Sequence, residues 1–200
     1  MEKPIIFRTD MVKAILDGRK TQTRRIIKPQ PGLARFVKTN HPKQAIQTVD
    51  GYLPDKEDDG RFSGYLEPGS PAGIEQYSPY QVGDKLWVRE VFNDWDGTYY
   101  RNPKYKATNE NYPNGVWKSP YHMTKTIARL WLEVTNVKVE RLQDISLEDI
   151  LAEGIEYDNE LGRGHLREKF RELWDSLNAK RGFGWDTNPY VFVYTFRRLK

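Results

Sequence analysis

The alternation of apolar and polar residues near the end of the chain constrains the fold most strongly. In residues 128–142, every second side chain is apolar at Leu130, Leu132 and Val134. This alternation is interrupted after Val134 and resumes at Val137 and Val139. In residues 189–198, aromatic residues alternate with valines, which is typical of a strand covered on both faces. Because strand side chains alternate between two faces, we expect two strands in the first segment and a long closing strand in the second.

Residues 81–92 predict a further strand, which follows a Gly-Asp turn. Leu86 and Val88 would point to one face of this strand, and Trp87 and Arg89 to the other. This alternation predicts a sheet with one apolar face.

The chain begins with a predicted short strand at residues 5–7 and a helix over residues 9–16. Apolar residues recur in that helix at three- and four-residue spacings, and Thr9 or Asp10 is expected to cap its start. Gly18 follows the last apolar position. Glycine readily adopts left-handed backbone angles, so we expect the helix to end there.

Two more helices are predicted before the closing strand. The first begins at Ser146, in the approximate capping box S-L-E-D, and ends at Gly154. The second covers residues 166–179, and its apolar stripe predicts that Trp174 belongs to the core.

Two long irregular segments interrupt this pattern, at about residues 28–80 and 93–120. The first is rich in proline, glycine and charge and predicts a flap. The second mixes tyrosine and tryptophan with lysine and arginine, which is typical of a single-stranded nucleic-acid platform and equally of a β-hairpin with one wet face. The element order predicts a single α+β domain over residues 1–200, with a small mixed β-barrel flanked by helices.

Composition excludes several kinds of site. The 200 residues include no cysteine and three histidines, so neither a thiolate nucleophile nor a structural zinc site is expected, and no metal or cofactor is predicted. The net charge of +4 is compatible with an anionic partner. No apolar run reaches signal-peptide or membrane-span length, so a cytoplasmic protein with no membrane partner is expected.

A basic cluster, G-R-K-T-Q-T-R-R, follows the first helix. Arg19, Lys20, Arg24 and Arg25 place four positive charges within seven residues, which is tolerated on a solvated face or next to an anion. Thr23 lies inside this cluster. The cluster therefore combines a hydroxyl with a lysine whose pKa the neighbouring cations would lower.

A threonine hydroxyl needs a base to act as a nucleophile, and a lysine can serve if its pKa falls toward neutrality. Lys20 and Thr23 would point to opposite faces of a regular strand, so their cooperation requires a turn or bulge near Thr21. A carboxylate is also needed to orient the pair. Several acidic residues qualify on sequence alone, namely Glu90, Glu148, Asp149 and Glu153.

Several motifs together resemble the ASCH domain family of the PUA-like superfamily. They are D-G-R-K-T-Q-T-R-R, V-G-D-K-L-W-V-R-E, V-T-N-V-K-V-E-R-L-Q-D-I-S-L-E-D-I-L-A-E-G-I and the aromatic closing strand. The resemblance covers about half of the chain and leaves the two irregular segments outside. The overall form of the chain, including the motifs W-D-S-L-N and N-P-Y-V-F-V near its end, also resembles ASCH proteins carried by phages and prophages.

The resemblance implies an activity, because small bacterial ASCH proteins are amidohydrolases that deacylate N4-acetylcytidine. By motif, their catalytic lysine, threonine and glutamate fall on Lys20, Thr23 and Glu153. The implied roles are base, nucleophile and proton shuttle, respectively. Residues assigned to substrate binding are Arg24, Arg25, Trp87 and Arg89.

An enzyme is therefore favoured, with a nucleoside or modified base as its ligand. One alternative is a non-catalytic module of phage origin that binds a modified base or single-stranded RNA or DNA. A second alternative is a ribonuclease, although a catalytic histidine is hard to identify.

Overall fold

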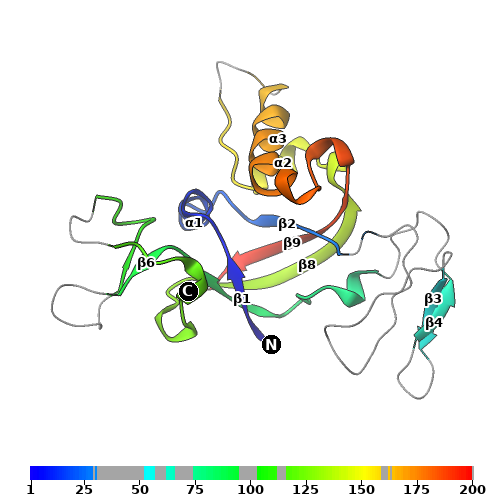
Figure 1. Cartoon of the computed structure of the whole chain (residues 1–200), viewed down its shortest axis with the longest axis horizontal. Helices are drawn as coiled ribbons and strands as arrows, with labels where there is room; N and C mark the ends of the chain where they lie inside the picture. Colours follow the sequence, from blue (N-terminus) through cyan, green and yellow to red (C-terminus); the bar gives the residue numbers. More distant parts are fainter. Residues whose placement is uncertain are drawn as a thin grey trace.

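The computed structural model describes residues 1–28, 30, 52–56, 62–65, 74–94, 103–111, 116–158, 162 and 164–199. One five-stranded sheet and three α-helices form the body of the molecule (Figure 1). The strands of this sheet are β1 (Glu2–Ile6), β2 (Gln22–Ile26), β5 (Lys85–Arg89), β8 (Trp131–Arg141) and β9 (Tyr190–Arg198). The helices are α1 (Thr9–Leu16), α2 (Leu147–Ala152) and α3 (Gly164–Asn178). No helix among the described residues could cross a membrane.

The strand order is β1-β5-β8-β9-β2. β1 and β5 run parallel, while the other neighbours are antiparallel. This arrangement confirms the predicted α+β class and mixed sheet. β1 and β2 are the two edge strands, and no pairing joins them in the described part of the chain, so the barrel is open between them.

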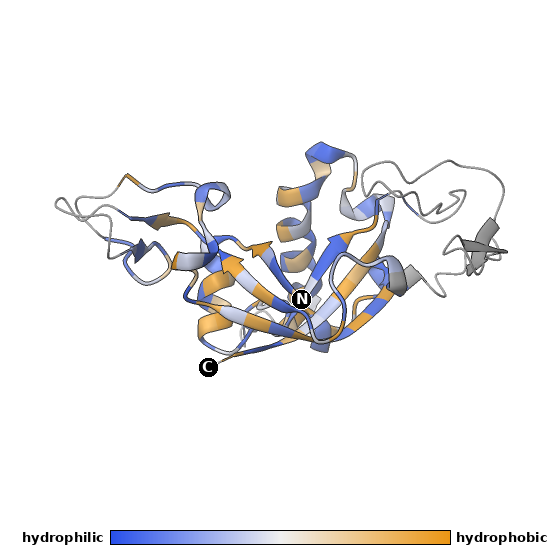
Figure 2. Cartoon of the chain, turned by 90° about the horizontal axis from the view of Figure 1, so that it is seen from below, coloured by the Kyte–Doolittle hydropathy of each residue, from blue (hydrophilic) through white to orange (hydrophobic). Residues whose placement is uncertain are grey.

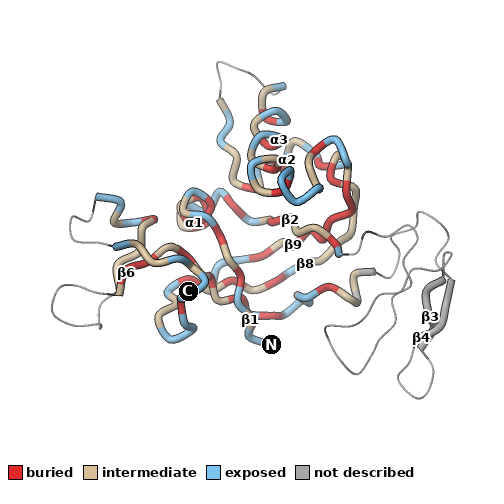
Figure 3. The backbone as a smooth tube through the Cα atoms, viewed as in Figure 1, coloured by how far each residue is buried: buried red, intermediate tan, exposed pale blue. Residues whose placement is uncertain are grey.

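The closing strand β9 occupies the interior of the sheet, between β8 and β2. Its residues 190–194 are all buried, which confirms the prediction of a strand covered on both faces (Figure 3). Phe192, Tyr194 and Phe196 belong to one apolar cluster, and Val191 and Val193 belong to a second cluster under the helices. β9 therefore ties the two halves of the core together.

The strand at residues 131–141 differs from the prediction of two strands. It is one strand, β8, and its register against β9 shifts between Val134 and Asn136. The extra residue forms a β-bulge, which resets the alternation without ending the strand. Elsewhere the alternation holds: in β5, Leu86 and Val88 are buried and Trp87 and Arg89 are half-buried. Figure 2 shows hydrophobic and hydrophilic residues interspersed along the strands of the sheet.

The helix ends largely follow the predicted signals. α1 has Arg8 at its N-cap, so neither Thr9 nor Asp10 caps it as expected, because the helix already begins at Thr9. Gly18 has a φ of +78° and follows its last turn, as predicted. The Ser146 hydroxyl accepts a hydrogen bond from the Asp149 N–H at 3.0 Å, which confirms the predicted cap of α2.

The irregular segments contain short elements. In the first, β3 (Tyr52–Lys56) pairs with β4 (Phe62–Tyr65), and a 3-10 helix covers Ile74–Tyr77. In the second, β6 (Phe92–Asn93) pairs with β7 (Lys104–Tyr105). Residues 29, 31–51, 57–61 and 66–73 of the predicted flap, and the tyrosines at 99, 100 and 112, lie outside the described residues. Further 3-10 helices are Pro120–His122, Lys125–Ile127, Leu142–Asp144, Ala179–Arg181 and Trp185–Thr187.

Asp84, in the turn before β5, supports an acid-dependent part of the stability. Burial would raise the pKa of this carboxyl, but hydrogen bonds from the Lys3 and Met1 ammonium groups and the Gln81 N–H outweigh it and lower the pKa to about 2. A folded-state pKa below the usual 3.8 stabilises the fold above pH 4 by about 2 kcal/mol, and this contribution is lost as the pH falls toward 2.

We therefore expect Asp84→Asn to lower the free energy of unfolding by about 2 kcal/mol at pH 7. Urea unfolding of both proteins at several pH values measures the difference, which should shrink steadily between pH 4 and pH 2. A difference that stays constant over this range would contradict the assignment.

Candidate functional site

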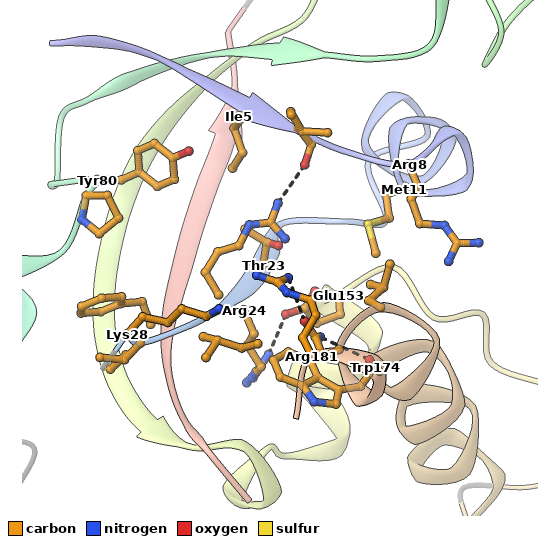
Figure 4. Close-up of a pocket in the computed structure, with 18 of the residues that line it drawn as sticks. Ile5, Arg8, Met11, Thr23, Arg24, Lys28, Tyr80, Glu153, Trp174 and Arg181 are labelled. Atoms are coloured by element: carbon orange, nitrogen blue, oxygen red, sulfur yellow. Dashed lines mark hydrogen bonds and ion pairs between the residues drawn. The ribbon is translucent and has the colours of Figure 1, made fainter. Parts of the chain in front are cut away.

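A pocket of about 720 Å³ opens at the unpaired edge of the sheet, between β1 and β2 (Figure 4). Its wall on one side is residues 4–6 of β1, and on the other side residues 23–28 in and after β2. The carboxyl-terminal half of α3 and the segment around Tyr80 complete it. The pocket therefore occupies the gap that barrel closure would fill.

A buried ion pair lies at this pocket. The Lys20 amine is 2.6 Å from a Glu153 carboxylate oxygen and also donates to the Glu153 main-chain carbonyl at 2.8 Å. The Lys20 side chain is fully buried and does not line the pocket, whereas Glu153 and Thr23 do. Of the four acidic residues left open by the residue types alone, Glu153 is the one whose carboxylate contacts Lys20 in the described part of the chain.

The other three carboxylates have different partners. Glu90 is buried and accepts two hydrogen bonds from Arg129, at 2.9 and 3.0 Å. Asp149 accepts from Arg24, and Glu148 is exposed on α2. None of the three lines the pocket.

Lys20 lies outside the strand, since a turn at residues 17–18 and an irregular segment at residues 19–21 precede β2. Lys20 and Thr21 precede β2, which begins at Gln22, so strand alternation does not govern the direction of the Lys20 side chain. The Thr21 N–H donates to Ala152 in α2, and the Thr21 carbonyl accepts from Phe196 in β9. These two bonds hold the segment between the sheet and the helix that carries Glu153.

Gly154 allows α2 to end against Lys20. Its φ is +92°, and a Cβ atom at this position would lie 2.9 Å from the Ala14 Cβ and 3.1 Å from the Lys20 Cβ. The glycine in L-A-E-G is therefore required both by backbone conformation and by close packing.

We expect Gly154→Ala to lower the free energy of unfolding by about 2–4 kcal/mol, from left-handed strain plus the clash with Ala14. Gly18→Ala is the matched control, because Gly18 has a φ of +78° but nothing within 4 Å of the added Cβ. The control should lose only about 1–2 kcal/mol. Equal losses in urea unfolding would show that the packing against Lys20 contributes nothing.

The environment of Lys20 disfavours its charged form. Burial is the largest cause and lowers the pKa of the amine, while Glu153 opposes this effect. Arg25 and Arg24 also lower the pKa, but contribute less. The sequence pointed first to the arginines, with burial adding to their effect, whereas in the structure burial is the larger cause.

Thr23 lies in β2, is only 1% exposed and lines the pocket. Strand pairing places it opposite Tyr194 of β9. Within the described part of the chain its hydroxyl makes no hydrogen bond, including none to Lys20. The hydroxyl is thus free to meet a ligand.

Arg24 lines the pocket, but its guanidinium is paired with carboxylates. Its guanidinium donates to Glu140 at 2.7 and 3.0 Å, to Asp149 at 2.9 Å and to Glu153 at 3.1 Å. Its side chain is 1% exposed. We therefore expect Arg24 to position the Glu153 carboxylate for Lys20, in place of the substrate contact suggested by the sequence.

Arg25 points across the opening between the edge strands. One of its nitrogens donates to the Ile6 carbonyl of β1 at 2.9 Å, and its guanidinium lies 5.3 Å from the Phe7 ring centre. Since a guanidinium carries five N–H donors, most of them remain for a ligand. Arg25 lines the pocket, as a substrate contact must.

Arg89 also lines the pocket, but Trp87 does not. Arg89 donates to the carbonyls of Pro120 and Tyr121, and its guanidinium lies 5.6 Å from the Trp87 ring. Trp87 therefore contacts Arg89 through its ring and does not itself reach the pocket.

Most of the residues that line the pocket were absent from the sequence-based site, among them Lys28, Tyr80, Trp174 and Arg181. Trp174 contributes to the core, as predicted, and also lines the pocket. Their convergence has no signal in the sequence, because they come from segments up to 153 residues apart, joined only by the fold.

No family model matches the chain, and no curated protein does either. A solved structure, an ASCH domain from Lactobacillus crispatus, matches it with a TM-score of 0.38 and 14% sequence identity, over 98% of this chain and 79% of that one. This similarity concerns the fold and assigns no activity to the chain.

Proposed function

We propose that the chain is an amidohydrolase that removes the acyl group from an N4-acylated cytosine nucleoside or a related modified base. The observation that carries the proposal is the buried Lys20–Glu153 pair at 2.6 Å, because Glu153 lines a ligand-sized pocket together with Thr23. The acylated cytosine itself comes from the resemblance to the small ASCH amidohydrolases. The proposed roles are base for Lys20, nucleophile for Thr23 and proton shuttle for Glu153.

The hydrogen bonds of Lys20 suit a base. Its amine has two acceptors, both on Glu153, and a neutral amine has two N–H donors. The neutral form therefore keeps both bonds and still has a lone pair for the Thr23 proton. Burial, which lowers the pKa of Lys20, favours this form.

The proposed reaction has two stages. The Thr23 oxygen bonds to the acyl carbon while its proton passes to Lys20, and Arg25 donates to the oxyanion that forms. The carbon–nitrogen bond then breaks as the leaving nitrogen takes up the proton through Glu153. Water hydrolyses the acyl-threonine ester, which releases the carboxylic acid and restores the Thr23 hydroxyl.

This sequence requires the Thr23 hydroxyl and the Lys20 amine to approach each other when substrate is bound. Catalytic hydrogen bonds often form only in the substrate complex, so their absence without substrate is compatible with the mechanism.

The test is to incubate the purified protein with N4-acetylcytidine and with longer N4-acylated cytidines, and to follow cytidine by chromatography. We expect cytidine and the free acid in equal amounts. Absence of turnover for every acylated cytosine would overturn the proposal.

The alternative of a non-catalytic binding module draws on the uncommitted cations around the pocket. It is distinguished by tight binding of a modified base without turnover. For the ribonuclease alternative, neither His122 nor His165 lines the pocket, and His41 lies outside the described residues.

A further inference from the structure

The charge of the pocket is strongly one-sided. Six cationic side chains line it, namely Arg8, Arg24, Arg25, Lys28, Arg89 and Arg181, against the single carboxylate of Glu153. That carboxylate already binds Lys20 and Arg24. A neutral nucleoside would leave most of this positive charge uncompensated.

Four of the six cations have no acidic partner among the described residues. Arg24 is bound by three carboxylates, and Arg8 lies 3.5 Å from Asp10. Within the described ranges, no carboxylate lies within 4.0 Å of the other four, Arg25, Lys28, Arg89 and Arg181. Like charges held close together repel one another, so their convergence favours an anionic ligand.

Two of these cations, Lys28 and Arg181, come from different elements and line the same pocket. Lys28 follows β2, and its amine lies 4.9 Å from the ring centre of Phe183, two residues after Arg181. Arg181 follows α3, and its guanidinium reaches Asn178 at 3.5 Å. Figure 4 shows that Lys28 and Arg181 both point into the pocket, toward Thr23. The attraction of a helix carboxyl end for cations explains Arg181 alone, and not Lys28, which comes from another element.

We infer that the pocket takes a phosphorylated ligand, whose phosphate binds between Lys28 and Arg181. This inference rests on the proposed function only for the identity of the base, which would lie at the Thr23 end. The substrate would then be an acylated cytosine nucleotide, free or within a strand, rather than the nucleoside.

Binding measurements separate this inference from catalysis. Titration calorimetry at low salt would compare each of the four common ribonucleosides with its 5′-monophosphate, its 3′-monophosphate and a dinucleotide that contains it. We expect at least one phosphorylated form to bind about tenfold or more tightly than its nucleoside. A hydrogen bond to a charged group contributes about 1.5–3 kcal/mol, and about 1.4 kcal/mol corresponds to a tenfold change in Kd. The preferred form distinguishes a free nucleotide from a strand.

Lys28→Ala and Arg181→Ala should each reduce the preference for the phosphate about fivefold or more, and leave the affinity for the nucleoside unchanged. Lys180→Ala is the matched control, since Lys180 is exposed next to Arg181 but does not line the pocket. Equal affinity for nucleosides and nucleotides, binding by none of the compounds, or an equal loss in the control would overturn the inference. Hydrolysis of acylated nucleosides without any phosphate preference would overturn this inference but not the proposed activity. Phosphate-dependent binding without hydrolysis would overturn only the proposed activity.

Discussion

Replacing Thr23 by valine should lower the kcat for N4-acetylcytidine by about 10³-fold or more while the protein stays folded. Valine keeps the shape of threonine but lacks the hydroxyl that would form the acyl-enzyme, and loss of a nucleophile costs about this much or more. Because the Thr23 hydroxyl makes no hydrogen bond within the described residues, its removal should change the free energy of unfolding by less than about 1 kcal/mol. Steady-state kinetics and urea unfolding measure the two effects.

Thr21→Val is the matched control for this substitution. Thr21 is two residues away and exposed, and its side chain does not line the pocket. The control should retain the parental kcat. If Thr23→Val kept more than about a tenth of the parental kcat, Thr23 would not be the nucleophile.

Replacing Arg24 by methionine should lower the free energy of unfolding by about 3–5 kcal/mol. The substitution removes the cation that three carboxylates share, those of Glu140, Asp149 and Glu153, and leaves them poorly compensated in a buried setting. It also releases the Glu153 carboxylate from its position, so we expect turnover to fall even at temperatures where the variant is folded. Arg24→Lys should recover little of the lost stability or turnover, because one ammonium group cannot reproduce the fork of N–H donors in a guanidinium.

Arg19→Met provides the comparison for Arg24→Met. Arg19 also contacts two carboxylates, Asp17 and Glu156, but its side chain is 36% exposed. An exposed pair of this kind contributes less than about 1 kcal/mol. A loss in Arg24→Met no larger than in Arg19→Met would show that the buried network does not hold the helix α2 to β2.

Local patterns were sufficient for most elements. The alternation in β5 and β9, the left-handed Gly18 and the Ser146 cap all depend on neighbours in the sequence, and the structure contains each of them. The bulge in β8 was missed, because a single extra residue interrupts the alternation as the end of a strand would.

The site was partly readable from the basic cluster. Lys20 and Thr23 lie close in sequence, so their chemistry could be considered together, and the requirement for a turn before the strand followed from side-chain alternation. The choice among acidic residues could not be made from the residues alone. The role of Arg24 was also hidden, since its three carboxylate partners are 116 to 129 residues away.

The sequence by itself determined the three helices, the strands β5 and β9, the position of the basic cluster and the absence of thiol chemistry, because these depend on periodicity, turn residues and composition. Only the tertiary structure decided which carboxylate faces Lys20 across 133 residues of chain, and that burial, more than the arginines, disfavours its charge. Only the tertiary structure brought Lys28 and Arg181 into the same pocket. The physical reason is that desolvation and charge compensation depend on the packing of distant segments, which local sequence patterns do not encode.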